Sequence, residues 1–287
     1  MQISAPNSLR KACSGVLIVV YQEDTRALRA ALAEEGLPSE EVKGPYTDEQ
    51  LGYSAVMQAL VNHANAWRIA AARTKPTIVV EPDFVPVRGF GALPLPVPLG
   101  RENDSLAYLY SVGPEVWDLA TPSVARAHCG SVVALVVPPR VAAMMLEFFE
   151  EEVAANAAGT YRPWDSGLGY WLLARGIESY MPYRHYGEHG GLGNPEHARF
   201  GLGRNHRADA LLGPLTFLPF YAQGSKQALW KQRLRGRAWG LLRLFSGRLL
   251  RWHDLRRARG ARLRLLRFAA GRLFLPRPPA SATRRPR

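Results

Sequence analysis

Two carboxylates at the end of an apolar run are the residues best suited to chemistry. Glu81 and Asp83 follow the run TIVV at residues 77–80, within the segment VVEPDF. Side chains alternate along an extended chain, so positions i and i+2 point the same way. Two acids that meet at one point outside a sheet suit a hard cation, Mg²⁺ or Mn²⁺. The alternative interpretation is an ordinary acidic turn around Pro82.

A third carboxylate, Asp165, is a candidate general base. It lies in the segment PWDSG at residues 163–167, where a loop leads into a helix. A carboxylate at such a place can take the proton of an attacking hydroxyl group, and the neighbouring Trp164 offers a surface on which a sugar can stack. The alternative for Asp165 is a helix N-cap. Glu188 is a second candidate base.

A segment rich in glycine and histidine, residues 185–206, contains His185, His189, His197 and His206. Its glycines allow the backbone to approach a ligand closely. We expect a lid over the ligand, with His189 as a third metal ligand, although a polar surface loop without a role is also consistent. The glycines argue against a helical zinc site, which would need compact pairs of ligands.

Alternating apolar runs and helical patterns predict the elements that position these groups. Continuous apolar, β-branched runs are typical of strands buried on both faces, and they occur at residues 15–21, 77–80, 106–112 and 131–137. Helical patterns occur at residues 24–35, 48–73 and 139–157 and from about Gly167, with Thr47 and Gln50 as a capping box. Loops are expected at residues 36–46 and 86–100. The alternation predicts an α/β fold with a mostly parallel sheet, and ligands bind at the carboxyl ends of such strands.

The predicted helix before the acidic pair carries a motif of its own. It reads GYSAVMQALVNHANAWRIAAA, and His63 and Trp67, four residues apart, share one of its faces. With VVEPDF, this block resembles glycosyltransferase family 25, the lipopolysaccharide-core type, whose members carry Gly, then Ser-His-x-x-x-Trp, then Glu-Asp-Asp. The matching positions in this chain are Gly52, Asn62-His63, Trp67 and Glu81-Pro82-Asp83. A histidine packed in the core is the alternative for His63.

The resemblance extends loosely over residues 15–190. LIVVYQEDTRALRAAL, ALVVPPRVAAMM and RPWDSGL echo further family segments, whereas Pro82, Asn62 and Ser54-Ala55 depart from the family pattern. It implies a GT-A-like nucleotide-binding sandwich that transfers a sugar from a nucleotide-sugar donor to a lipopolysaccharide-type, lipid-linked or other glycan acceptor. It also implies Mn²⁺ or Mg²⁺ as cofactor. The expected donor contacts are Tyr21, Arg26, His63, Glu81 and Trp164, and the expected metal ligands are Glu81, Asp83 and His189. Pro82 leaves open a degenerate relative that binds a nucleotide or glycan without turnover.

Charge divides the chain into two unlike parts. Residues 226–287 hold 19 Lys and Arg and one acid, Asp254, so their net charge is +18, whereas residues 1–225 sum to −5. A uniformly basic nucleic-acid-binding fold would not divide in this way. We therefore expect a catalytic body at residues 1–225, a basic arm at residues 226–275 and a disordered tail at residues 276–287.

The arm alternates arginine with Leu, Trp and Phe, a pattern typical of a helix lying on an anionic membrane. A solvated or nucleic-acid-binding tail and helices packed on the body are the alternatives. No run approaches the ~18 apolar residues of a spanning helix, and the first apolar run is too short for a signal peptide. With only Cys13 and Cys129, no disulfide framework is expected. These features predict a cytoplasmic protein, peripheral on the inner face of the cell membrane.

Overall fold

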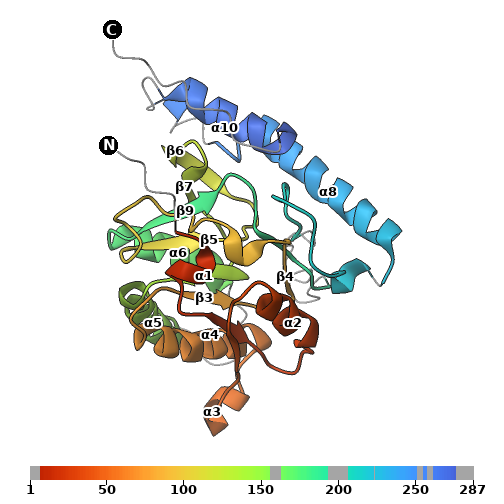
Figure 1. Ribbon diagram of the computed structural model, residues 1–287. Helices are drawn as coiled ribbons and strands as arrows, with labels where there is room; N and C mark the ends of the chain where they lie inside the picture. Colours follow the sequence, from red (N-terminus) through yellow and green to blue (C-terminus); the bar gives the residue numbers. More distant parts are fainter. Residues whose placement is uncertain are drawn as a thin grey trace.

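A computed structural model describes residues 7–155, 163–192, 206–222, 224–250, 255–256 and 261–275. Within these ranges the main sheet has eight strands in the order β2-β1-β3-β8-β5-β9-β7-β6 (Figure 1). The strands are β1 (Val16–Val19), β2 (Ser39–Val42), β3 (Thr77–Val80), β5 (Ser105–Tyr108), β6 (Glu115–Thr121), β7 (Val124–His128), β8 (Ala134–Val137) and β9 (Glu178–Pro182). Six of these strands share one direction, and β8 and β7 run the opposite way. The α/β class is confirmed, and the sheet is mixed.

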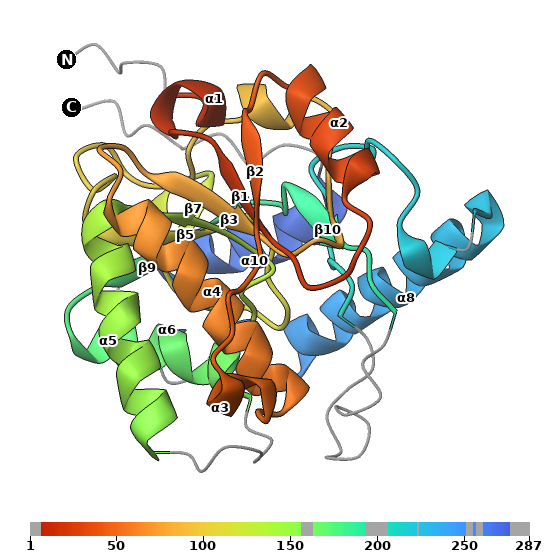
Figure 2. The same cartoon turned by 90° about the horizontal axis from the view of Figure 1, so that it is seen from below.

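Helices cover both faces of this sheet. They are α1 (Leu9–Ala12), α2 (Arg26–Glu34), α3 (Asp48–Leu51), α4 (Ala55–Ala71), α5 (Pro139–Ala155), α6 (Trp164–Ala174), α8 (Lys226–Phe245) and α10 (Arg262–Phe274), with short 3₁₀ turns η1 (Phe90–Ala92) and η2 (Phe220–Ala222). Figure 2 shows α4 and α5 side by side over one face. Leu17 and Val19 of β1 join the core under α4 and α5, whereas Val16 and Ile18 join the core under α1 and α2. This alternation is what a strand buried on both faces requires.

Two expected elements near the N-terminus differ in the structure. The single helix expected at residues 48–73 is divided into α3 and α4 by a break that begins at Gly52. The capping box of Thr47 and Gln50 is present, but it starts the short α3, and the Ser54 hydroxyl caps α4. Strand β2 lies inside the expected loop 36–46. Its sequence SEEV is polar because it is an exposed edge strand, so it lacks the apolar run of a central strand.

A second, two-stranded sheet includes part of the segment expected to be a histidine-rich lid, because one of its strands, β10, lies within residues 185–206. In it, β4 (Phe84–Pro86) pairs antiparallel with β10 (Gly187–His189). Gly187 permits this pairing, because a Cβ atom there would lie 2.2 Å from the Phe84 ring. The pairing sets residue 189 opposite residue 84, and the Gly190 amide donates to the Asp83 carbonyl at 2.8 Å. His197 lies outside the described residues.

The basic C-terminal segment packs on the body. Leu265 and Phe268 of α10 are about 1% exposed and belong to the same apolar core as the strands and α5. On α8, a Cβ atom at Gly236 would lie 2.8 Å from the Ala208 carbonyl oxygen, so this helix also fits closely against the body. The expected division at residue 225 is therefore corrected: residues on both sides of it share one core. Residues 276–287 lie outside the described part.

A buried ion pair reinforces this packing. The Arg272 guanidinium, which is 0% exposed, donates to both carboxylate oxygens of Asp209 at 2.9 and 3.0 Å. His185 Nε2 lies 2.9 Å from Asp209 Oδ1. Burial raises the pKa of Asp209, but Arg272 and His185 outweigh it and hold that pKa well below its ordinary value. Among the described residues, no helix is long and apolar enough to cross a bilayer.

Candidate functional site

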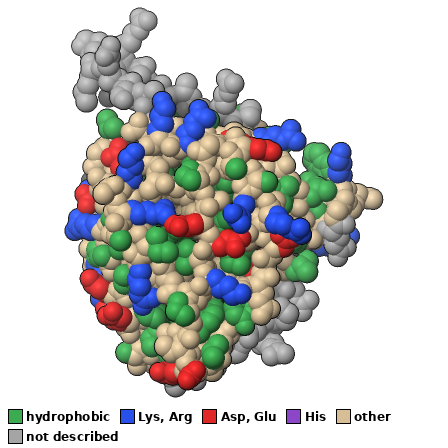
Figure 3. Space-filling view, turned by 60° about the horizontal axis from the view of Figure 1, so that its bottom comes forward, with side chains coloured by type: hydrophobic (Ala, Val, Ile, Leu, Met, Phe, Trp, Pro, Cys, Tyr) green, Lys and Arg blue, Asp and Glu red, His purple; other side chains and the backbone are tan. Residues whose placement is uncertain are grey.

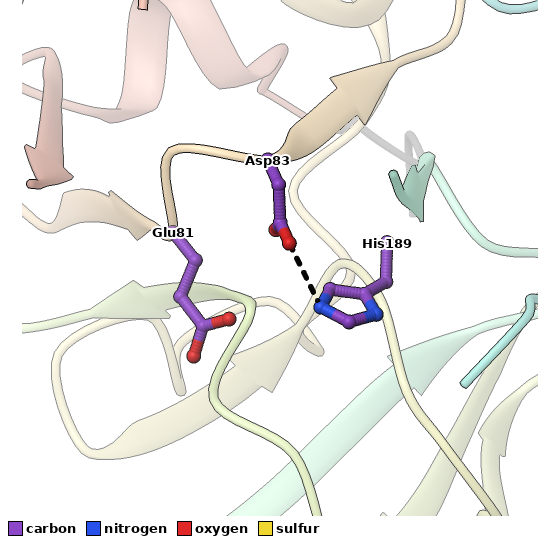
Figure 4. Close-up of side chains that lie close together, drawn as sticks. All are labelled: Glu81, Asp83 and His189. Carbon is purple, nitrogen blue, oxygen red and sulfur yellow. Dashed lines mark ion pairs between the residues drawn. The ribbon is translucent and has the colours of Figure 1, made fainter. Parts of the chain in front are cut away.

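A tight turn at the carboxyl end of β3 presents the acidic pair. The Phe84 amide donates to the Glu81 carbonyl at 3.1 Å, so residues 81–84 form a hydrogen-bonded turn with Pro82 at its second position, where proline is favoured. This corrects the expectation of an extended segment. The turn still places both carboxylates just beyond the carboxyl end of β3, where the chain leaves the main sheet and continues into β4 (Figure 4). Pro82 therefore shapes the turn without removing either acid.

The structure brings the three expected metal ligands together. One potential ligand atom from each of Glu81, Asp83 and His189 lies within 4.8 Å of the others, and Figure 4 shows the side chains around a common space. His189 Nε2 lies 3.0 Å from Asp83 Oδ2. Glu81 Oε1 also lies 3.6 Å from Nε2 of the buried His63. The cluster joins residues 108 positions apart because β10 pairs with β4 directly after the turn.

The absence of a side chain at Gly191 leaves room for the carboxylate of Asp83. A Cβ atom at residue 191 would lie 2.1 Å from Asp83 Oδ2 and 3.4 Å from His189 Nε2. At residue 190 a Cβ atom would lie 2.7 Å from the Asp83 carbonyl oxygen. The two glycines after His189 therefore let this loop lie directly against Asp83, which is the close backbone approach that glycine permits.

The electrostatics of the cluster suit a cation. Burial lowers the pKa of His189, but the adjacent Asp83 carboxylate and the more distant Glu81 outweigh it and raise that pKa to about 9. The imidazolium thus occupies a place where two carboxylates favour positive charge. Asp83 Oδ1 is buried and has no hydrogen-bond partner among the described residues. Two carboxylates and one imidazole with an unsatisfied oxygen are a donor set that Mn²⁺ accepts.

A pocket of about 430 Å³ surrounds the cluster. Most of the residues expected to act in the site line it, although they come from five separate segments of the chain. These are Tyr21, His63, Glu81, Asp83, Trp164, Asp165 and His189. Their segments follow β1 and β3, lie on α4, begin α6 and end β10. The pocket thus opens beyond the carboxyl ends of the parallel strands β1 and β3, the place where open α/β sheets bind ligands.

His63 and Trp164 form an aromatic wall of the pocket. His63 is 1% exposed, and its ring packs with those of Trp67 and Trp164 in a cluster whose three centroid distances are 5.3 to 6.0 Å. The Trp164 indole donates to the Val56 carbonyl at 3.0 Å. His63 is therefore both a packed core residue and a neighbour of Glu81. Trp164 is only 4% exposed, so it walls the pocket and offers little ring face for stacking.

Asp165 lies in the first turn of α6, whose N-cap is Pro163. Its Oδ1 accepts from the Ser166 amide at 2.8 Å. Burial, helped by the charge of Glu81 and opposed by the hydrogen bond from Ser166, raises the pKa of Asp165 to about 6. Asp165 is therefore not the N-cap residue. It is a pocket-lining carboxyl group whose proton affinity suits general-base chemistry near neutral pH.

Three further pocket residues were not among the sequence-based candidates. The Tyr46 ring packs edge-on against Tyr21 at 6.2 Å between centroids. The Asn62 side chain donates to the Val20 carbonyl at 3.2 Å and accepts from the Gly44 amide at 3.1 Å, so it links α4 to the segments that follow β1 and β2. The Arg207 guanidinium donates to the carbonyls of His189 and Gly191, at 2.9 Å each. Asn62 matched the family motif and could have been chosen, whereas Tyr46 and Arg207 lie in segments without a motif.

Two expected site residues lie elsewhere. Arg26 begins α2, is 90% exposed and pairs with Asp24 at 2.6 Å, because the two residues share one exposed turn. It borders a separate depression along α2. Glu188 is 0% exposed, accepts from the Ala208 amide at 2.8 Å and pairs with Arg233 of α8. Since side chains alternate along β10, Glu188 points away from the pocket that His189 lines.

No family model matches this chain, and no curated protein matches it.

Proposed function

We propose that this protein is a metal-dependent glycosyltransferase with a GT-A-like fold, which moves a sugar from a nucleotide-sugar donor to a glycan acceptor. The observation that carries the proposal is the cluster of Glu81, Asp83 and His189 inside a pocket at the carboxyl end of β3. The sequence resemblance to glycosyltransferase family 25 places its acidic motif on the same turn. Geometry and motif therefore support the same chemistry.

Glu81, Asp83 and His189 would hold the cation. When bound, a divalent ion supplies positive charge that stabilises the diphosphate as it leaves the sugar. An imidazole ligand beside two carboxylates favours Mn²⁺ over Mg²⁺, because Mg²⁺ prefers oxygen ligands and keeps much of its water. Arg207 adds to this arrangement by fixing the backbone on both sides of Gly190.

Of the remaining pocket residues, one group would contact the nucleotide of the donor and another would contact the acceptor. Tyr21 and Tyr46 present two aromatic rings at the end of β1, beside the amide of Asn62, and together they suit a planar base. Asp165 would face the acceptor. It takes the proton of the acceptor hydroxyl as that oxygen bonds to the anomeric carbon, while the bond from this carbon to the diphosphate breaks.

The experiment is a donor screen with the full chain. We expect nucleoside diphosphates to raise the unfolding temperature only with Mn²⁺ present, because two carboxylates would otherwise repel the diphosphate. The donor identified in this way should then lose its labelled sugar to a saccharide acceptor. Absence of any Mn²⁺-dependent shift across the common nucleoside diphosphates would contradict the proposal.

A second candidate is a binding protein of the same fold without turnover. The ion pair between Asp83 and His189 favours it, since a protonated imidazole balances the charge of this carboxylate without a cation. The donor screen separates the two candidates: a binding protein shows the thermal shift but transfers no sugar to an acceptor.

Nucleic-acid binding is the weakest of the three functions. Figure 3 shows a face of the body on which Lys and Arg side chains are interspersed with Asp and Glu. A nucleic-acid-binding face instead gathers basic residues into a continuous patch or stripe. The basic residues that are concentrated lie in α8 and α10, where they alternate with large apolar side chains.

A further inference from the structure

Helix α8 exposes large apolar side chains although its opposite face is packed. Trp230 is 68% exposed, Leu234 is 66% exposed and Phe245 is 79% exposed. At about 100° per residue these three lie within an arc of about 60°. The opposite face carries Gly236 and Gly240, which contact the body through Ala208 and Asp209. The apolar strip is therefore a surface feature of a docked helix.

Helix α10 repeats the arrangement. Leu263, Leu266 and Phe274 are 57%, 45% and 62% exposed, while Leu265 and Phe268, on the inner face, are about 1% exposed. Helices α8 and α10 also contact each other and lie on the same side of the molecule (Figure 1). Both exposed apolar strips are therefore carried by neighbouring helices on that side of the fold.

All the charged residues of these two helices are basic. Lys231 and Arg235 flank the apolar strip of α8, and Arg264 and Arg267 are exposed beside that of α10. Neither helix contains an acidic residue. Large apolar side chains with tryptophan, bordered by bases alone, form the pattern of a helix that lies in the headgroup zone of an anionic bilayer.

We propose that the outer face of α8 and α10, with Trp230, Leu234 and Phe245 at its centre, binds the surface of an anionic lipid bilayer. The positive charge of these helices is complementary to acidic lipid headgroups. Their most exposed large side chains are apolar, and binding to nucleic acid would leave these side chains exposed to water. This membrane face uses only the outer residues of the segment, since Arg272 and Phe268 are held inside the protein.

The face lies close to the candidate site. Gly236 of α8 packs against Arg207 and Ala208, and Arg207 lines the pocket. A bilayer on α8 would therefore hold the pocket near the lipid surface. Membrane binding itself does not depend on the proposed transfer of sugar, because none of its residues belongs to the metal cluster.

The test is co-sedimentation of the full chain with vesicles of phosphatidylcholine, with and without phosphatidylglycerol. We expect binding only to the anionic vesicles, weakened but not abolished by high salt, because burial of apolar side chains persists when charge is screened. The variant Trp230→Ser/Leu234→Ser/Phe245→Ser should reduce binding at least tenfold. Lys231→Glu/Arg235→Glu should reduce it on anionic vesicles.

Control substitutions elsewhere on the protein test whether vesicle binding is specific to this face or reflects non-specific adsorption of the protein to lipid. Leu99→Ser removes a leucine that is 79% exposed, and Lys11→Glu reverses an exposed charge, both away from α8 and α10. Both should bind vesicles like the original chain. All variants replace exposed residues, so their unfolding temperatures should be unchanged and any loss of binding is then assigned to the surface.

Four results would overturn the proposal. The first is no binding to anionic vesicles at low salt. The second is a triple variant that binds as well as the original chain. The third is a concentration-dependent dimer, abolished by the triple variant, without vesicle binding, which would assign the face to a second copy of this chain. Tight binding to duplex DNA without vesicle binding would likewise overturn it. None of these results depends on whether the pocket binds Mn²⁺ or a donor.

Discussion

At the scale of single residues, the candidate site holds Asp83 and His189 in contact, and Glu81 has a carboxylate oxygen within 4.8 Å of both. Asp83 and His189 are 3.0 Å apart, and glycine at position 191 leaves room for the Asp83 carboxylate. A histidine that binds a metal ion must be a neutral imidazole, so under the proposed function a cation would take the place of the proton on His189. Binding of the cation would then exchange one positive charge for another and release a proton.

Asp165 gives the sharpest prediction at this scale. Asp165→Asn keeps the shape of the side chain but removes the proton acceptor, so turnover should fall about 10²–10⁴-fold while donor binding is retained. Because the pKa of Asp165 is raised to about 6, the original chain should lose activity as pH falls through about 6, when the carboxylate becomes protonated. The measurement is a pH–rate profile of both proteins.

The control is Asp118→Asn, an exposed carboxylate of β6 that pairs with Arg126 outside the pocket. It should keep both the rate and the acid limb of the profile. If Asp165→Asn instead weakened donor binding as much as it lowered the rate, Asp165 would be a structural residue of α6 and not the base.

At the scale of elements, α10 is anchored to the body by the buried guanidinium of its own Arg272. Asp209, His185 and Arg272 are all buried, and Arg272 supplies two of the hydrogen bonds that Asp209 accepts. A chain ending at residue 225 would lose this guanidinium together with Leu265 and Phe268. The C-terminal segment is therefore needed for the stability of the body as well as for its outer surface.

Arg272→Ala should reduce the free energy of unfolding by about 3–5 kcal/mol, because it leaves the Asp209 carboxylate buried without its main partner. Arg267→Ala, an exposed arginine on the same helix, should change it by less than about 0.5 kcal/mol. Chemical denaturation of the three proteins provides the comparison. Equal stability of the Arg272 variant and the original chain would contradict the assigned role of this ion pair.

At the scale of the whole molecule, the sequence predicts the parts of the fold where one chemical pattern dominates. The apolar runs of β1, β3 and β8 and the amphipathic pattern of α5 were recognisable. The β6–β7 hairpin is not predicted, because β6 is mostly half-buried and the sequences of both strands, EVWDLAT and VARAH, mix polar and apolar types without a clear period. The C-terminal sequence predicts a separate basic arm, because an arginine-rich pattern does not reveal that Arg272 has a partner 63 positions earlier.

The residues of the candidate site can likewise be predicted only where a local sequence pattern marks them. Glu81, Asp83 and Asp165 were found because they follow a strand or begin a helix, where side chains project beyond the sheet. His189 was chosen as a histidine in a glycine-rich segment, and the β4–β10 pairing brings it to Asp83. Tyr46 and Arg207 could not be found in this way. Only tertiary packing places them at the pocket.

Direct titration of Mn²⁺ into the full chain without nucleotide tests whether Glu81, Asp83 and His189 bind a divalent cation, as we propose. Calorimetry should show one site in the original chain and in Glu34→Ala, which removes an exposed carboxylate of α2. Affinity should fall at least tenfold in Asp83→Ala, because this variant removes the carboxylate that contacts His189. Mn²⁺ binding of unchanged affinity in Asp83→Ala would contradict the claim, as would no binding to the original chain.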